Sequence, residues 1–493
     1  MGVRVRYSPS PTGTQHMGSA RTALFNWLYA RHHGGTLVLR IEDTDQARSR
    51  PEHVENLCRT MRWLGLDWDE GPEVGGPHAP YHQMGRLTSY RAALDALVLR
   101  DSAYPCYCSP AELQQRRVEA RRAGLPPRYD GRCAHLSPEQ RASLESSGVR
   151  PAWRLRVPSE GETVVQDLVR GRVAFANRTL DDFVLMRPDG VPTYNFAVVV
   201  DDAEMKITHV LRADEHLANT PKQLLVCAAL GWTPPHFGHL PMVLAADRSK
   251  LSKRHGAVAI EEFREMGLLP EAVVNYCALL GWSPADGREI LTLNELRDVF
   301  DLDRVGASAA VYDITKLLWL NAQHLRRLDA IEVVRRATPW LQQAGLPDVD
   351  AAERYRLVAA TSLVQERIQT LADLPAAVAY FFGDPDAYDP AGVRKFFGPG
   401  TAALLHLAAD RVESLEPFGE SELEAAYRRL AEDQGVKPAV FIHPTRLALT
   451  GRTVGPSLFA LAAGLGRGVC VRRLRAAAGW IAARAIPAED AGG

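Results

Sequence analysis

The sequence lacks any hydrophobic segment long enough to cross a membrane. Such a segment needs about 18 consecutive apolar residues, and no run in the 493 residues reaches that length. A signal-peptide pattern is missing as well. Cysteine is scarce, and the seven cysteines form no dense framework of the kind that stabilises secreted domains. We therefore expect a cytoplasmic protein with no membrane contact.

The sequence also lacks an excess of charge of either sign. It has 58 basic and 59 acidic residues, which gives a formal net charge of -1. Overall charge therefore does not indicate a nucleic-acid partner, and only a local basic face could bind one. Apolar residues make up 46% of the chain, as in ordinary globular proteins. The length allows for about three or four compact units.

Strand and helix patterns alternate near the start of the chain. The run "VRVRYSP" is typical of a short strand, and the apolar spacing over 16–33 predicts a helix that ends at Gly34 and Gly35. "TLVLRIED" suits a strand buried on both faces, and "PEHVENLCRTMRWLGL" returns to the helical period. This alternation predicts a parallel α/β sheet. It fades over 103–191, resumes with "YNFAVVVDD" and "KITHVLRAD", and gives way to helical patterns beyond 257.

The stretch "SPSPTGTQHMGSA" (8–20) lies between the first predicted strand and the first predicted helix. The N-terminus of a helix carries unpaired N–H groups and a partial positive charge, so it can bind a phosphate. Gly18 would let a nucleotide approach the backbone, and His16 could donate a hydrogen bond to a phosphate oxygen. Taken alone, an ordinary helix start with a packing glycine is the simpler interpretation.

A second stretch, "SKLSKRHG" (249–256), follows the last predicted strand of the α/β region. A mobile basic loop can close over a triphosphate and neutralise its charge in the transition state. A solvated run of charges would explain this stretch equally well if it stood alone. The order of the two stretches on one predicted fold favours a shared nucleotide site.

Together the two stretches resemble the two signatures of the class I aminoacyl-tRNA synthetases. Further segments resemble the bacterial glutamyl-tRNA synthetase family, namely "RIEDTD", "DEGPEVGGP", "PTYNFAVVVDD" and "THVLRADEH". The resemblance runs from Arg4 to near the C-terminus. Ser19, Leu251, Arg254 and His216 depart from the commonest family pattern, and none of them removes a group that the chemistry needs.

The resemblance implies an α/β ligase with a parallel-sheet, Rossmann-like catalytic domain. L-Glutamate would attack the α-phosphate of ATP, with Mg²⁺ accompanying the ATP, and the acyl group would pass to the 3'-terminal adenosine of tRNA(Glu). We expect the enzyme to act as a monomer. The residues implied in catalysis and ATP binding are His16, Gly18, Glu215, the backbone of Val243, Lys250, Leu251, Ser252, Lys253 and Arg254.

A dicarboxylic amino acid needs two cations and an anion in one pocket. The predicted strands end at Arg6, Glu42 and Arg212, and ligands of open α/β sheets bind beyond such carboxyl ends. By resemblance, Arg6 would bind the side-chain carboxylate of glutamate and Arg212 its main-chain carboxylate, which suits bidentate arginine pairing. Surface salt bridges are the alternative for either arginine. The other residues implied at the pocket are Tyr194, which with Glu42 would bind the amino group, and Ser8, Ser10 and Asn195.

A cysteine cluster lies within 103–191. "CYC" and "CAH" supply Cys106, Cys108, Cys133 and His135, which match a closed tetrahedral Zn²⁺ site. A metal could replace a missing core in this segment, and such a zinc would be structural. Buried free thiols beside a surface histidine are the alternative. The remaining cysteines are expected to be small core residues: Cys58, Cys227, Cys277 and Cys470.

The resemblance also implies how the chain is divided. The C-terminal half should be all-helical, and the whole should comprise five segments. Two of them, 1–102 and 192–256, are the halves of the Rossmann catalytic domain, and the second half carries the lysine loop. An α/β acceptor-stem and zinc-binding domain is inserted between them at 103–191. A helical stem-contact domain follows at 257–325, and a helical anticodon-binding domain with a break near 383–390 occupies 326–493.

The helical C-terminal half carries the predicted RNA contacts. In "LVQERIQTL", Arg367 occupies the position at which glutamate-specific relatives carry an arginine that faces the third anticodon base. Base reading in RNA uses guanidinium stacking and hydrogen bonds. We therefore expect an enzyme that discriminates against tRNA(Gln). The basic tail residues Arg472, Arg473 and Arg475 could touch RNA, although a solvated helix face is the simpler interpretation.

Several alternatives stay open at this point. A non-discriminating enzyme would also charge tRNA(Gln). Glutaminyl-tRNA synthetases usually show Pro-Glu-Pro where this chain has Pro9, Ser10 and Pro11, and they end in β-barrels. A paralogue that glutamylates a modified tRNA base stops before an anticodon domain. An inactive tRNA-binding protein is disfavoured by the intact His16 and Lys250.

Overall fold

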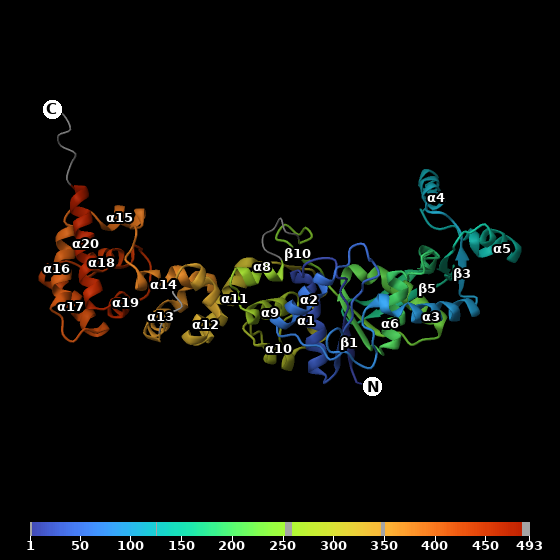
Figure 1. The fold of residues 1–493 in the computed structure, drawn as a ribbon, viewed down its shortest axis with the longest axis horizontal. Coiled ribbons are helices and arrows are strands. Elements are labelled where there is room, and N and C mark those ends of the chain that lie inside the picture. Colours follow the sequence, from blue (N-terminus) through green and yellow to red (C-terminus); the bar gives the residue numbers. More distant parts are fainter. Residues whose placement is uncertain (1, 125, 252–258, 347–350, 486–493) are drawn as a thin grey trace, which may run out of the picture. The chain divides into compact units, whose positions relative to one another are not determined.

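The computed structural model describes residues 2–124, 126–251, 259–346 and 351–485 (Figure 1). Two compact units emerge. The first comprises Met1–Arg264 and Pro270–Ile314, and the second comprises Glu265–Leu269 and Thr315–Gly493. The finer division into five segments stays a prediction. Among the helices of the described ranges, none has both the length and the apolar character that a membrane span requires.

Parallel strands form the centre of the first unit. β1 (Arg4–Tyr7) pairs with β2 (Thr36–Leu39), and β8 (His209–Ala213) pairs with β9 (His236–Leu240), both in parallel. The two pairs lie side by side, because the amide of Thr208 donates to the carbonyl of Arg4 at 2.9 Å. The predicted parallel sheet is therefore confirmed, and the carboxyl ends of β1, β2 and β8 meet at one edge.

Helix α1 (Met17–His32) connects β1 to β2, as the apolar spacing predicts. Its face of Phe25 and Leu28 is fully buried in the core. The helix ends before Gly34, which adopts a positive φ of 59° that glycine tolerates best. Outside the segment 103–191, the other α-helices of this unit are α2 (Pro51–Trp63), α3 (Leu87–Leu99), α6 (Tyr194–Glu204), α7 (Thr220–Leu230), α8 (Ile260–Glu265), α9 (Pro270–Leu279) and α10 (Leu293–Val299).

The segment 103–191 has its own antiparallel sheet but is also tied to the parallel one. β3 (Ala103–Cys106), β4 (Ala152–Leu155) and β7 (Val184–Met186) form the antiparallel sheet. The hairpin of β5 (Glu162–Asp167) and β6 (Gly171–Ala176) extends the parallel sheet, since β5 pairs with β9 at Asp167 and Phe237. The segment also has two α-helices, α4 (Pro110–Arg122) and α5 (Pro138–Ser146), and neither of these two contains a buried residue.

The second unit is helical, which confirms the prediction for the C-terminal half. Residues 383–389 connect α14 to α15, and the predicted division into subdomains at this point stays a prediction. Phe381, Phe441 and Leu474 are among its buried core residues. Its helices are α11 (Ile314–Arg327), α12 (Ala330–Gln343), α13 (Ala351–Val364), α14 (Leu374–Phe382), α15 (Pro390–Phe396), α16 (Thr401–Glu413), α17 (Glu420–Asp433), α18 (Ala439–Thr450), α19 (Leu458–Leu465) and α20 (Arg467–Ala485).

Candidate active site

His16 caps the N-terminus of α1 with its imidazole. The amide of Ser19 donates to Nδ1 of His16 at 3.3 Å, and the amide of His16 donates to Oγ of Ser19 at 3.0 Å. Because Nδ1 accepts a hydrogen bond, the neutral ring carries its proton on Nε2. Desolvation lowers the pKa of His16, against an opposing effect of Glu215. The ring therefore presents a neutral Nε2–H donor beside the helix N-terminus, where anions bind.

Gly18 leaves room for this imidazole. A Cβ atom at residue 18 would lie 3.3 Å from both Cε1 and Nδ1 of His16, which is closer than ordinary van der Waals contact. Any larger side chain would therefore press on the ring. The glycine of the predicted signature is explained by the neighbouring histidine in addition to any nucleotide.

The two ends of the lysine loop lie beside the predicted nucleotide site. Lys250 pairs with Leu244 of β10 (Val243–Leu244), and its Nζ lies 3.3 Å from Oε2 of Glu215. After the loop, Ala259 pairs with His16, and the amide of Ile260 donates to the carbonyl of Gln15 at 2.9 Å. The two signature stretches thus converge. Ser252, Lys253 and Arg254 lie outside the described residues.

Arg212, at the end of β8, is a buried cation held by neutral groups. Its guanidinium donates to Nε2 of His239 at 3.1 Å, to the hydroxyl of Tyr194 at 3.3 Å and to Oγ1 of Thr220 at 2.8 Å. Within the described ranges, no carboxylate forms an ion pair with it. Burial lowers the pKa of Arg212, and the nearby Arg6 acts in the same direction. Asp202 offsets part of the charge from a longer distance, but a buried cation without a carboxylate in direct contact is costly, so this site favours an anionic ligand.

Arg6, at the end of β1, has a carboxylate on only one side. Its Nε lies 3.3 Å from Oδ1 of Asp202, and its terminal nitrogens form no hydrogen bond with the residues that the structure describes. The same Asp202 accepts a hydrogen bond at 2.7 Å from Arg40, which is fully buried. The free edge of Arg6 can therefore pair with a carboxylate of a ligand.

Glu42 lies in the same network. Its Oε1 is 3.4 Å from the guanidinium of Arg40, and the side chain is buried. Burial raises the pKa of Glu42 to about 7, although the Arg40 and Arg6 charges oppose that rise. Arg6, Arg212 and Glu42 all influence the hydroxyl of Tyr194, whose pKa is raised by burial. Two arginines and a carboxyl group therefore act on one hydroxyl, and their role in binding glutamate stays a prediction.

The remaining predicted pocket residues differ in how they are placed. Oγ of Ser8 is buried and has no hydrogen-bond partner among the described residues, which leaves it for a ligand. Asn195 is already engaged, since its Oδ1 accepts from Gln223 at 3.1 Å. Ser10 is exposed. Val243 is paired with Ala310 of β11 (Ala310–Val311), whose amide donates to the carbonyl of Met242.

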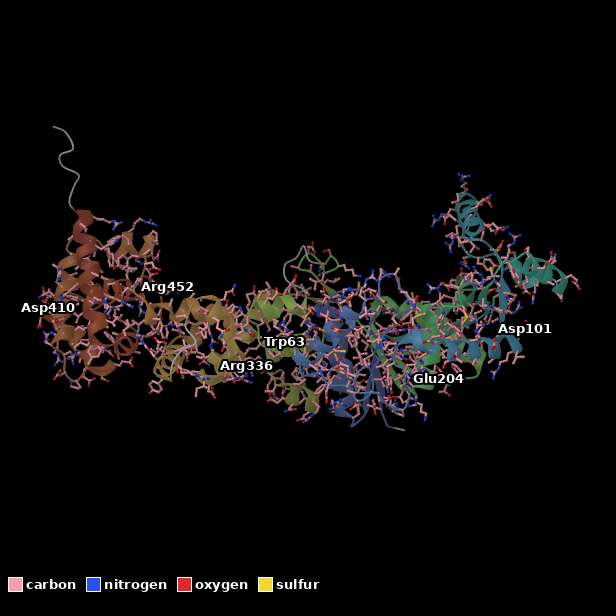
Figure 2. All side chains as sticks on the ribbon, in the orientation of Figure 1. Trp63, Asp101, Glu204, Arg336, Asp410 and Arg452 are labelled. Carbon is pink, nitrogen blue, oxygen red and sulfur yellow. The ribbon has the colours of Figure 1, made fainter. Side chains whose placement is uncertain are left out.

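Sequence reasoning missed the acidic groups that hold the arginines. Asp201 and Asp202 lie in the last turn of helix α6 and are buried. Asp201 accepts from Arg86 at 2.7 Å and from the hydroxyl of Tyr90 at 3.0 Å. Arg86 also donates to Glu204, the last residue of α6. Glu204 is labelled in Figure 2. In the sequence, the only sign of these buried acids was the pair of aspartates in "YNFAVVVDD", because an apolar helix seldom carries two adjacent acids without buried partners.

The predicted zinc ligands are partly assembled. The sulfur atoms of Cys106, Cys108 and Cys133 all lie within 4.8 Å of one another, whereas His135 is exposed and outside this group. The hydroxyl of Tyr129 lies 3.4 Å from Sγ of Cys106. The hydrogen bond between Cys106 and Cys133 lowers the pKa of Cys106 and raises the pKa of Cys133, and burial raises the pKa of Cys108, so the cluster favours a thiolate, the form that binds metals, at Cys106. The three sulfurs fit a soft ion such as Zn²⁺.

The predicted RNA-contact residues of the second unit fall into two groups. Arg367, in the short 3₁₀ helix Gln365–Arg367, is exposed and makes no hydrogen bond with a described residue. The tail arginines have acidic partners instead. Arg472 and Arg473 both contact Asp384, and Arg475 contacts Asp410 (Figure 2) at 3.0 Å. The tail arginines are thus occupied by intramolecular pairs, whereas Arg367 remains open to a ligand.

The fold and this arrangement are those of a class I aminoacyl-tRNA synthetase. Residues 2–319 match the family model of the catalytic domain of class I tRNA synthetases (E and Q), and residues 332–478 match a model of an anticodon binding domain. The anticodon domain removes the alternative of a paralogue that stops before it.

Relatives of known identity narrow the assignment. The chain is 51% identical to a glutamate–tRNA ligase of Moorella thermoacetica over 97% of this chain and 98% of that protein. It is also 50% identical to a glutamate–tRNA ligase of Desulforudis audaxviator, over 98% of this chain and 97% of that protein. A crystal structure of a glutamate tRNA ligase from Elizabethkingia meningosepticum, in complex with its amino acid, superposes with a TM-score of 0.90 at 33% identity and covers 97% of this chain and 99% of that one. The chain belongs to the glutamate–tRNA ligase family.

Proposed function

We propose that the protein activates L-glutamate with ATP and transfers it to the 3'-terminal adenosine of tRNA(Glu). The observation that carries this proposal is the pair Arg6 and Arg212. Among the described residues, the terminal nitrogens of Arg6 form no hydrogen bond and no carboxylate forms an ion pair with Arg212; both arginines are buried and act, with Glu42, on the hydroxyl of Tyr194. A ligand with two carboxylates and an ammonium group satisfies all three charges at once.

Each group of the pocket then has a proposed role. Arg212 binds the main-chain carboxylate, Arg6 binds the side-chain carboxylate, and Glu42 with Tyr194 binds the ammonium group. Glutamine would leave Arg6 opposite a neutral amide, so the site should prefer glutamate. Ser8 is supported as a further contact by its unpartnered, buried hydroxyl.

ATP occupies the neighbouring region in our proposal. The Nε2–H of His16 donates to phosphate oxygens, and Gly18 and the backbone of Val243 contact the adenosine. Lys250 exchanges its contact with Glu215 for the phosphates. Mg²⁺ supplies charge neutralisation on the triphosphate when it is bound with ATP. The protein contributes chiefly alignment and electrostatic stabilisation of the transition state.

We further propose the finer features of the enzyme. Arg367 reads the anticodon and makes the enzyme discriminate against tRNA(Gln), a role supported by its exposed, unengaged side chain. Zn²⁺ is held by Cys106, Cys108 and Cys133, with His135 as the proposed fourth ligand, and it stabilises the segment without entering the chemistry. The enzyme acts as a monomer in the cytoplasm, in keeping with its free cysteines.

Isotope exchange between ATP and pyrophosphate tests the pocket directly. We expect exchange that depends on glutamate and requires tRNA(Glu), as the family resemblance implies. Arg212→Gln should raise the glutamate KM at least about thirtyfold, since a buried charge pair contributes roughly 2–5 kcal/mol. The ATP KM serves as the internal control and should change little. Exchange that proceeds equally well with Arg212→Gln would contradict the assigned role.

A further inference from the structure

We propose that Asp167 and His239 are positioning residues that hold Arg212 ready for its carboxylate ligand. This inference rests on the role of Arg212 in the proposed function. Asp167, His239 and Arg212 come from β5, β9 and β8, which are consecutive strands of one sheet. The three side chains form a continuous buried chain from the segment 103–191 to the pocket.

The first link joins Asp167 to His239. Oδ2 of Asp167 lies 2.5 Å from Nδ1 of His239, and both side chains are inaccessible to solvent. The other carboxylate oxygen, Oδ1, accepts the backbone amides of Val169, Arg170 and His239 at 2.9, 2.8 and 3.2 Å. Burial would raise the pKa of Asp167, but these hydrogen bonds outweigh it and hold the pKa below its usual value. Asp167 is therefore an ionised acceptor with a fixed orientation.

The second link follows from the first. An ionised Asp167 requires a proton on Nδ1 of His239, and burial lowers the pKa of His239, so the ring is neutral. Its Nε2 therefore has a free lone pair. That lone pair faces Nε of Arg212 at 3.1 Å, and the hydroxyl of Thr220 lies at the same distance from it. Asp167 thus selects the only tautomer that can accept a hydrogen bond from Arg212.

This arrangement suits an arginine that must bind an anion. A carboxylate placed directly on Arg212 would compete with the substrate for the guanidinium, whereas a neutral acceptor fixes the group and leaves it without a carboxylate in direct contact. The contact is made by Nε, so it can orient the plane of the guanidinium. Arg6 differs, because its Nε pairs with the carboxylate of Asp202.

Asp167→Asn tests the tautomer argument, because the structure dictates how the asparagine must lie. The three backbone amides require an oxygen at the Oδ1 position, so the amide NH₂ would face Nδ1 of His239. Nδ1 would then have to accept, and the proton would move to Nε2, opposite the Nε–H of Arg212. Because Arg212 would lose one hydrogen bond, we expect the glutamate KM in aminoacylation to rise about tenfold or more. The ATP KM should stay within about twofold of the wild-type value.

A nearby acid provides the matched control. Asp214 pairs with Arg170 at 2.5 Å and is partly exposed. Asp214→Asn removes a charge from the same neighbourhood without touching His239, so it should leave the glutamate KM unchanged. Equal effects of the two variants would overturn the proposal, because the change would then reflect local charge alone.

Two substitutions of His239 separate positioning from packing. His239→Gln can place an amide oxygen near the position of Nε2, where it could accept from Arg212. His239→Asn can place an amide group only near the position of Nδ1, where it could contact Asp167 but not Arg212. We expect a glutamate KM within about threefold of the wild type for Gln and about tenfold higher for Asn. An equal rise in both variants, or a parallel rise in the ATP KM, would overturn the inference. If Arg212→Gln alone leaves the glutamate KM unchanged, the proposed function fails instead, so the two failures are distinguishable.

Discussion

Glutamate binding should depend on pH through Glu42. The pKa of this buried carboxyl is raised to about 7, above its ordinary value, so the protonated form predominates below pH 7. Only the ionised form can pair with the ammonium group of the substrate. The ionised fraction is about one tenth at pH 6 and about nine tenths at pH 8, so the glutamate KM should be about tenfold higher at pH 6.

Initial rates of aminoacylation, with saturating ATP and tRNA(Glu), would measure this dependence across that range. Glu42→Gln carries no titrating group, so its glutamate KM should be high and nearly constant with pH. The ATP KM of the wild type reports any general effect of pH on the enzyme. A glutamate KM that is equally flat in the wild type and in Glu42→Gln would refute the reasoning.

Three further substitutions test other parts of the structure. Gly18→Ala should displace the imidazole of His16, because the added Cβ would lie 3.3 Å from the ring, and raise the ATP KM about tenfold with little change in the glutamate KM. Cys106→Ser should reduce the zinc content measured by metal analysis and lower the unfolding temperature, whereas Cys58→Ser should leave the metal content unchanged. Arg40→Met should lower the free energy of unfolding by about 3–5 kcal/mol in denaturant titrations, because it leaves the buried carboxylates that contact Arg40 without this cationic partner. An effect below about 1 kcal/mol would contradict that account.

The local signals of the sequence were sufficient for the framework of the fold. Apolar runs and turn residues predict β1, β2 and α1, and the structure confirms them. The convergence of His16 with the ends of the lysine loop follows from motif order on a parallel sheet. "YNFAVVVDD" was less informative, because a short apolar run suits a buried strand or a buried helix, and tertiary packing makes it helix α6.

Long-range polar contacts could not be predicted in the same way. The acids that hold the pocket arginines lie far away in the chain, such as Asp202 opposite Arg6 and Asp167 behind His239. No local spacing encodes such pairs. The cysteine spacing predicted three sulfurs together, but it could not reveal that the hydroxyl of Tyr129 would lie 3.4 Å from Sγ of Cys106 or that His135 would lie outside the group.

Transfer of amino acids to purified tRNA(Glu) by the purified protein tests the central claim most directly. Two buried guanidiniums that both act on the hydroxyl of Tyr194 should accept a dicarboxylic amino acid and reject its amide. We predict that labelled glutamate is attached to tRNA(Glu) and that labelled glutamine is not. Attachment of glutamine at a comparable kcat/KM, or no attachment of either amino acid, would contradict the account.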